Sequence, residues 1–295
     1  MNRRSFLISS AAAVGAVPLR VLAAAQGARP PVKRDRLRLS ITWGMFRDRA
    51  LPEAFALMAK NDFDAFEMFN WRSPELLDAV AAEMKKHKLE CACLIANKGV
   101  KAPGCSLTNP KERDAFLGEI GLSIKAAKKV SSKRLVVLTG DDVPGMSRAA
   151  MMDSCVAGLK EAAPLLERGG ITAVVEVLNT HVDHAGYFLH FVRDGAEMID
   201  RVGSPSVKLL FDIYHVQIME GNLIRLIRDN IQRIAHFHIG DNPGRNQPGT
   251  GEINYRNVYR AILDTGYDGF AALEYRPTVL LEEDMPAQRR LSILV

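Results

Sequence analysis

The sequence lacks the cysteine and glycine patterns that mark zinc-finger and dinucleotide-binding proteins. Its four cysteines, Cys91, Cys93, Cys105 and Cys155, do not have the spacing of a zinc motif. We expect them to be thiols of the core, and one disulfide in an oxidising compartment stays open without an assigned pair. No G-x-G-x-x-G follows the first expected strand, which argues against a dinucleotide site.

The chain also lacks an apolar run near its N-terminus that reaches the about 20 residues of a membrane-spanning helix. The first 25 residues instead carry Arg3 and Arg4, an alanine-rich apolar stretch over 6–17 and small residues at 22–25. This pattern is typical of a cleaved twin-arginine signal peptide. We therefore expect residues 1–25 to engage the twin-arginine export machinery. The mature protein would be periplasmic or secreted, without stable membrane insertion.

A strong excess of positive charge is missing from the expected mature chain. The formal net charge of +5 at pH 7 falls to +2 without residues 1–25, which contain three arginines and no acidic residue. Nucleic-acid binding depends on a basic surface, so this partner loses most of its electrostatic support. We expect a small-molecule partner and no nucleic acid, and the sequence leaves a homo-oligomer open.

What the sequence does contain is a regular alternation of short apolar segments and amphipathic segments. Its 295 residues are 47% hydrophobic and 25% charged, as in an ordinary folded protein. After a linker at 26–36, strands are expected at 37–46, 63–69, 89–96, 134–139, 171–178, 207–213, 233–239 and 270–275. Helices are expected at 52–60, 74–87, 111–130, 147–168, 187–201, 219–230 and 255–265.

Eight strands that alternate with helices over about 250 residues predict a (β/α)8 TIM barrel. We expect one such domain over residues 37–295, and a doubly wound sheet is the alternative. The last segment, 278–295, is short for a closing helix, so the C-terminus is expected to be atypical.

Polar side chains occur near the ends of the last four expected strands. These residues are Glu176, Asp212, His238 and Glu274. In a barrel, the C-terminal ends of the strands meet at one rim, where active sites are built. Three carboxylates brought together there would repel one another without a cation. The sequence therefore predicts that these four residues bind one divalent metal ion.

The residue types also limit the metal. Carboxylate oxygens with one imidazole favour Mn²⁺ or Mg²⁺, and they remain compatible with Co²⁺ or Zn²⁺. His215, three residues after Asp212, is expected to face the site. His236, which shares a strand face with His238, is a weaker candidate.

Four stretches of the second half of the sequence are EVLNT, FDIYHVQIMEGNL, AHFHIGDNPGRNQPGTGEINY and LEYRP. They resemble the hydroxypyruvate isomerase family, within the xylose isomerase-like TIM-barrel superfamily. The resemblance is densest over 171–277 and thinner over 37–170. It implies a (β/α)8 barrel with the ion at the four residues named above. It also implies that Glu176 and Glu274 are acid/base groups, and that His215 and Arg245 contact the substrate's oxygens.

Two departures from the family pattern concern the substrate. Hydroxypyruvate isomerases tend to carry glutamine at the position of His238, whereas related ketose epimerases carry histidine. The segment IANKGVKAPG, residues 95–104, replaces a histidine-asparagine-leucine-proline type of sequence. The sequence therefore leaves isomerisation and epimerisation both open.

The expected activity is that of a divalent-metal-dependent isomerase or epimerase of a sugar or hydroxy-keto acid. The proton would move through a metal-bound enediolate, with Glu176 and Glu274 on opposite sides of the substrate carbon. Three alternatives remain. A polyol dehydratase would use the same site, an apurinic endonuclease would need more histidine ligands, and a non-catalytic carbohydrate-binding barrel would share only the fold.

Overall fold

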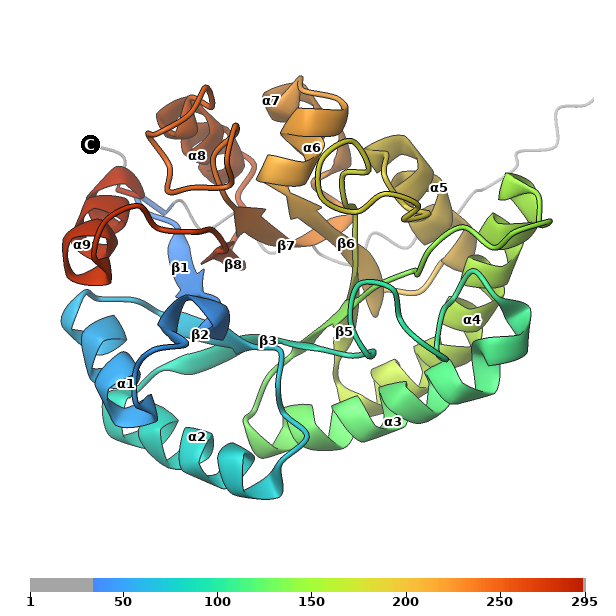
Figure 1. The fold of residues 1–295 in the computed structure, drawn as a ribbon, viewed down its shortest axis with the longest axis horizontal. Coiled ribbons are helices and arrows are strands. Elements are labelled where there is room, and N and C mark those ends of the chain that lie inside the picture. The colour runs from blue at the N-terminus through green and yellow to red at the C-terminus, as the bar shows by residue number, and fades with distance from the viewer. Residues whose placement is uncertain (1–33, 294–295) are drawn as a thin grey trace, which may run out of the picture. The chain divides into compact units, whose positions relative to one another are not determined.

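The structure, a computed structural model, describes residues 34–293. The expected signal peptide and residues 26–33 of the expected linker lie outside the described residues. Eight parallel strands form one sheet in the order β1-β8-β7-β6-β5-β4-β3-β2 (Figure 1). Their bounds are β1 Arg38–Ile41, β2 Ala65–Met68, β3 Glu90–Ile95, β4 Arg134–Val137, β5 Thr172–Glu176, β6 Val207–Asp212, β7 Ile234–Ile239 and β8 Phe270–Leu273. The prediction of a (β/α)8 barrel is confirmed.

The barrel closes between β1 and β2, the two strands at the ends of this order. The contact there is a parallel bridge between Thr42 and Glu67, just past the end of β1. The backbone N–H of Asp64 donates to the carbonyl of Leu39 at 3.0 Å. The carboxylate of Asp64 accepts from the N–H of Leu39 at 2.9 Å. This seam therefore has fewer backbone bonds than the other strand pairs, which form ladders.

Helices surround the sheet in the ring that Figure 1 shows. Their bounds are α1 Leu51–Lys60, α2 Pro74–His87, α3 Arg113–Lys129, α4 Arg148–Gly169, α5 Val192–Val202, α6 Ile213–Met219, α7 Leu223–Asn230, α8 Tyr255–Asp264 and α9 Leu281–Leu291. Two 3₁₀ turns, η1 Trp43–Phe46 and η2 Pro110–Glu112, complete the elements of the described chain. No helix of residues 34–293 has the length and apolar character needed to cross a membrane.

Several expected boundaries were wrong. The strand expected to 46 ends at Ile41, because the N–H of Met45 bonds back to the carbonyl of Thr42 at 3.0 Å and closes the turn of η1. The helix expected from residue 219 begins at Leu223, and Met219 is instead the last residue of α6. Gly221 and Asn222, which lie between the two helices, have φ values of 58° and 52° that a right-handed helix cannot contain.

The C-terminal expectation was also wrong, because α9 is a regular closing helix. Its first turn contains three acidic residues and its last turn two arginines, the distribution that the helix dipole favours.

The prediction that the cysteines are thiols of the core is confirmed. All four cysteines are free and buried.

Candidate active site

The side chains of Glu176, Asp212, His238 and Glu274 meet at the carboxyl ends of the last four strands. His238 lies at their centre. Its Nδ1 is 3.0 Å from Oε1 of Glu176, 2.9 Å from Oε2 of Glu274 and 3.9 Å from Oδ2 of Asp212. The structure thus brings together the four residues for which the sequence predicted convergence, and we call them the quartet.

Strand register and chain position explain this convergence. Glu176 ends β5 and Asp212 ends β6, where Asp212 pairs directly with His238 of β7. Glu274 follows β8, and its backbone N–H donates to the carbonyl of Ile239 at 2.9 Å. Neighbouring parallel strands therefore present all four side chains to the same rim of the barrel.

Asp212 has a second role, as the N-cap of α6. Its Oδ1 accepts from the backbone N–H groups of Tyr214 at 2.8 Å and His215 at 3.2 Å. The strand ends at Asp212, one residue earlier than expected, and the helix begins directly after it. The capping bonds fix the carboxylate, so that Oδ2 is the oxygen directed to the quartet.

The electrostatics of the quartet fit a bound cation. Burial raises the pKa of Asp212 to about 7 and also raises the pKa of Glu176, because a buried carboxylate loses its hydration. Burial acts on Glu274 in the same direction, but the charges of Arg245 and His238 outweigh it and lower that pKa to about 2. One ligand atom from each quartet residue lies within 4.8 Å of the others. Three carboxylates and one imidazole at this spacing suit a divalent ion.

His215 is fully buried beside the quartet, as the sequence predicted. Its Nδ1 lies 2.6 Å from the side-chain amide of Asn179, and its Nε2 lies 3.5 Å from Oδ2 of Asp212. The amide donates to Nδ1, so Nε2 carries the hydrogen. Among the described residues, that Nε2 has no hydrogen-bond partner, and it is therefore available to a ligand oxygen at the quartet.

Arg245 reaches the quartet from the loop after β7. Its Nη2 lies 2.7 Å from Oε2 of Glu274 and 3.4 Å from Oδ2 of Asp212, and its guanidinium lies 5.2 Å from the ring centre of Tyr214. One guanidinium therefore offsets part of the charge of two quartet carboxylates.

Asp241 holds the loop that carries Arg245. Its buried carboxylate accepts from the backbone N–H groups of Asn242, Gly249, Gly251 and Ile253 at 2.8–3.2 Å. A Cβ on Gly251 would lie 2.2 Å from the carbonyl oxygen of Asn242. The loop can therefore close around Asp241 only with glycine at 251.

Glu67, on the opposite wall of the barrel, is the participant that the sequence reasoning missed. Its Oε2 lies 3.1 Å from Nε2 of His238, and its Oε1 lies 2.5 Å from Nε2 of His236. His236 therefore pairs with Glu67 and does not join the quartet. Burial alone would raise the pKa of Glu67, but the two imidazoles outweigh it and hold that pKa below its usual range. The feature that could have indicated its role is the position of this carboxylate inside β2, a strand whose residues are all buried.

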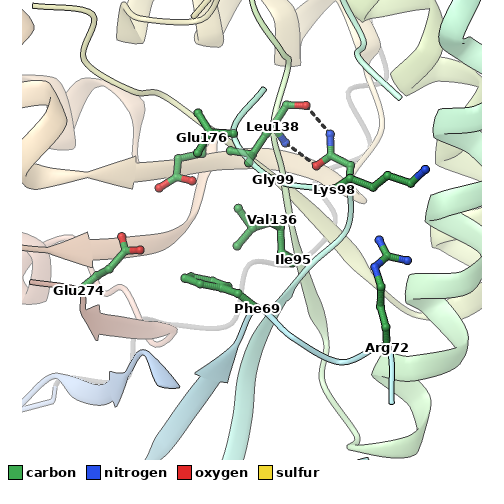
Figure 2. Close-up of a pocket in the computed structure, with 11 residues that line it drawn as sticks. Phe69, Arg72, Ile95, Lys98, Gly99, Val136, Leu138, Glu176 and Glu274 are labelled. Atoms are coloured by element: carbon green, nitrogen blue, oxygen red, sulfur yellow. Dashed lines mark hydrogen bonds between the residues drawn. The ribbon is translucent and has the colours of Figure 1, made fainter. Parts of the chain in front are cut away.

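A cavity of about 410 Å³ opens next to the quartet. Figure 2 shows Glu176 and Glu274 at one end of it, with Phe69 in the middle and Lys98 and Arg72 at the opposite end. Arg72 is already paired with Glu119 at 2.7 Å. The cavity is large enough for a small organic molecule, and the two glutamates lie at one end of it.

The comparisons with known proteins agree with the fold and with the class of enzyme. The family model "xylose isomerase-like TIM barrel" matches residues 55–291. Hydroxypyruvate isomerase of Escherichia coli K12 is 34% identical over 173 residues, which are 59% of this chain and 67% of that protein. 2-Oxo-tetronate isomerase of Cupriavidus necator is 31% identical over 236 residues, which are 79% of this chain and 90% of that protein.

A similar solved structure is a family 2 AP endonuclease from Brucella melitensis. It has a TM-score of 0.77 and 28% identity, and the match covers 84% of this chain and 96% of that chain. The curated relatives named as isomerases support the prediction that this protein is an isomerase enzyme. The chain belongs to the xylose isomerase-like TIM-barrel family.

Proposed function

We propose that this protein is a divalent-metal-dependent isomerase or epimerase of a small hydroxy-carbonyl compound, either a sugar or a hydroxy-keto acid. The observation that carries the proposal is the quartet, in which Glu176 and Glu274 both lie within about 3 Å of the imidazole of His238. The curated relatives named hydroxypyruvate isomerase and 2-oxo-tetronate isomerase support the same class of reaction.

The quartet would hold the ion. A divalent ion bound there would polarise the substrate's carbonyl and hydroxyl oxygens and would make the neighbouring C–H more acidic. Glu176 ends β5, Glu274 follows β8, and the two side chains face the same space (Figure 2), so one can remove a proton and the other can return one. Return to the adjacent carbon is isomerisation, and return to the opposite face of the same carbon is epimerisation.

Two further side chains would orient the substrate. The Nε2–H of His215 and the guanidinium of Arg245 both lie beside Asp212 and can donate to substrate oxygens. Donors that are fixed before the substrate arrives stabilise negative charge as it develops on those oxygens. The buried Asn179 that fixes His215 belongs to this arrangement through its 2.6 Å contact.

The test replaces the two proposed acid/base groups. Glu176→Gln and Glu274→Gln keep the shape of the side chain but cannot take up a proton, so each should lower turnover by about 10²-fold or more. The assay follows uptake of solvent deuterium into the product, with Mn²⁺ or Mg²⁺ and a panel of hydroxypyruvate, free ketoses and inososes. Glu53→Gln, an exposed glutamate of α1, is the matched control.

A variant that keeps more than about a tenth of the wild-type rate would contradict the assigned roles, because acid/base catalysis contributes far more than that. Product analysis separates an isomer or epimer from the dehydrated product of a lyase. About one tightly bound divalent ion per purified chain is expected. No bound ion under metal-replete conditions would support a non-catalytic carbohydrate-binding barrel instead.

We also propose that residues 1–25 direct export through the twin-arginine machinery. The paired Arg3 and Arg4 before an apolar, alanine-rich stretch support this proposal. In a bacterial host, the mature protein should appear in the periplasm without these residues, and replacement of both arginines by lysine should retain it in the cytoplasm. Cytoplasmic accumulation of the unchanged chain would contradict the proposal.

A further inference from the structure

A second cavity, of about 240 Å³, meets the first one at Phe69 and Glu274. It lies on the β1 side of the quartet and is lined by three arginines, Arg47, Arg245 and Arg276. Among the described residues that line it, Glu274 is the one carboxylate. The cavity therefore has a formal excess of positive charge next to a group proposed to transfer protons.

Two of these arginines have no carboxylate partner among the described residues. The ion pairs of that part of the chain include Arg245, which binds Glu274 and Asp212, but neither Arg47 nor Arg276. The Nε of Arg47 donates to the carbonyl of Gly44 at 3.0 Å. Gly44 lines the same cavity, so this bond places the guanidinium at the cavity wall. Its two terminal nitrogens remain available to an incoming anion.

We infer that this arginine-lined cavity is the subsite for an anionic group of the substrate, a carboxylate or a phosphate. The inference rests on the proposed function and deepens it, because it selects hydroxy-keto acids or acidic sugars over neutral ketoses. Guanidinium groups pair with carboxylate and phosphate through two parallel hydrogen bonds, and they keep their charge at all physiological pH values.

The position of the subsite suits the proposed reaction. Glu274 belongs both to the cavity and to the quartet, so an anionic group held by the arginines leaves the neighbouring carbons of the same molecule beside Glu274. An anionic substrate would also be repelled by the three quartet carboxylates, and the nearby arginines offset that repulsion. The cationic end of the first cavity is less suitable, because Arg72 already binds Glu119 there.

The experiment compares acidic and neutral substrates in Arg47→Gln, Arg276→Gln and the double variant. Each single change should raise KM for hydroxypyruvate about 10-fold or more, which is the usual size of a lost hydrogen bond to a charged group. The kcat value, and both constants for a neutral ketose, should stay near the wild-type values. Arg276→Lys should recover part of the loss, and Arg260→Gln, on the exposed face of α8, is the matched control.

A binding measurement gives a readout without turnover. Calorimetry with tartronate, a dicarboxylate that has no ketone to isomerise, should show the same loss of affinity in Arg276→Gln and none in Arg260→Gln. A phosphorylated ketose is assayed in parallel. Preference for the phosphorylated ketose assigns the subsite to phosphate, and preference for hydroxypyruvate assigns it to carboxylate.

The outcomes that overturn the inference differ from those that overturn the proposed function. Equal losses on acidic and neutral substrates, or unchanged tartronate binding in the double variant, would refute the subsite. Deuterium uptake into neutral ketoses without any reaction of the acids would refute the subsite and leave the isomerase intact. Loss of tartronate binding in Arg276→Gln, with no isomerisation of any substrate, would leave the subsite and refute the isomerase.

Discussion

At the scale of single residues, Glu67 links β2 to the two histidines of β7. Its carboxylate contacts His236 and His238, and the hydroxyl of Ser40 donates to it at 3.2 Å. A carboxylate that accepts from the far nitrogen of a metal-ligating histidine fixes both the tautomer and the orientation of the ring. With Nε2–H of His238 donated to Glu67, Nδ1 is left as the nitrogen that faces the quartet carboxylates.

Replacement of Glu67 should therefore weaken the ion site without removing a ligand. Glu67→Gln removes the charge that orients His238, and we expect the affinity for Mn²⁺ to fall about 10- to 100-fold. Calorimetric titration of the metal-free protein measures this change. Ser40→Ala, which removes one hydrogen bond to the same carboxylate, should have a much smaller effect. Equal Mn²⁺ affinity in Glu67→Gln and the wild type would show that Glu67 does not position the ring.

The sequence could predict the quartet but not Glu67, and the reason is physical. Each quartet residue lies near a strand end in a chain whose alternation predicts a barrel, so shared topology was enough to bring them together. Glu67 and His236 are 169 residues apart and meet across the barrel interior. Such a contact depends on side-chain direction within a layer of the barrel, which the alternation of strands and helices does not specify.

At the scale of elements, the loop over 240–254 is organised by one buried carboxylate. Asp241 collects backbone N–H groups from both ends of the loop, and Arg245 lies on the turn between them. The motif DNPGRNQPGTGEINY was recognised from its resemblance to a family, but its physical basis is this set of hydrogen bonds. The position of Arg245 at the quartet therefore depends on residues that do not touch the quartet.

Gly251→Ala should disturb this loop. The added Cβ would come within 2.2 Å of the carbonyl oxygen of Asn242, so the backbone must shift and Arg245 must move with it. We expect a loss of about 1–3 kcal/mol in the free energy of unfolding, as for other overpacked positions, together with a higher KM. Urea unfolding and steady-state kinetics measure the two effects.

The control for this change is Gly118→Ala in α3. A Cβ there meets no atom within 4 Å, and alanine favours a helix over glycine, so stability should be unchanged or slightly higher. If Gly251→Ala behaved like Gly118→Ala in both assays, the proposed dependence of Arg245 on the loop would be wrong.

The positions of the strands and helices were predictable from hydrophobic periodicity. Their first and last residues were less predictable. All eight strands occur where they were expected, because each is a short apolar run between helical patterns. The errors fall where local hydrogen bonds decide the boundary. Capping by Asp212 starts α6 directly after β6, and the left-handed backbone at Asn222 separates α6 from α7.

At the scale of the whole molecule, the cysteines make a prediction about the redox state. Burial raises the pKa of all four thiols, so the reactive thiolate form is suppressed in the folded protein. Ellman's reagent at pH 8 should therefore label the native protein very slowly and should label four thiols after denaturation. Rapid labelling of the native protein, or a denatured protein with only two reactive thiols, would contradict the structure.

Glu67 takes part both in the closure of the barrel and in the candidate active site. The backbone of Glu67 forms the parallel bridge to Thr42, while its side chain reaches His238 on the far wall. A fluctuation that separates these two strands would move the carboxylate of Glu67 away from the imidazole of His238. It would thereby weaken the binding of a cation at the quartet. By reciprocity, a cation bound at the quartet should slow amide hydrogen exchange along the β1–β2 boundary. Exchange at this weakly bonded seam would then report whether the ion site is occupied.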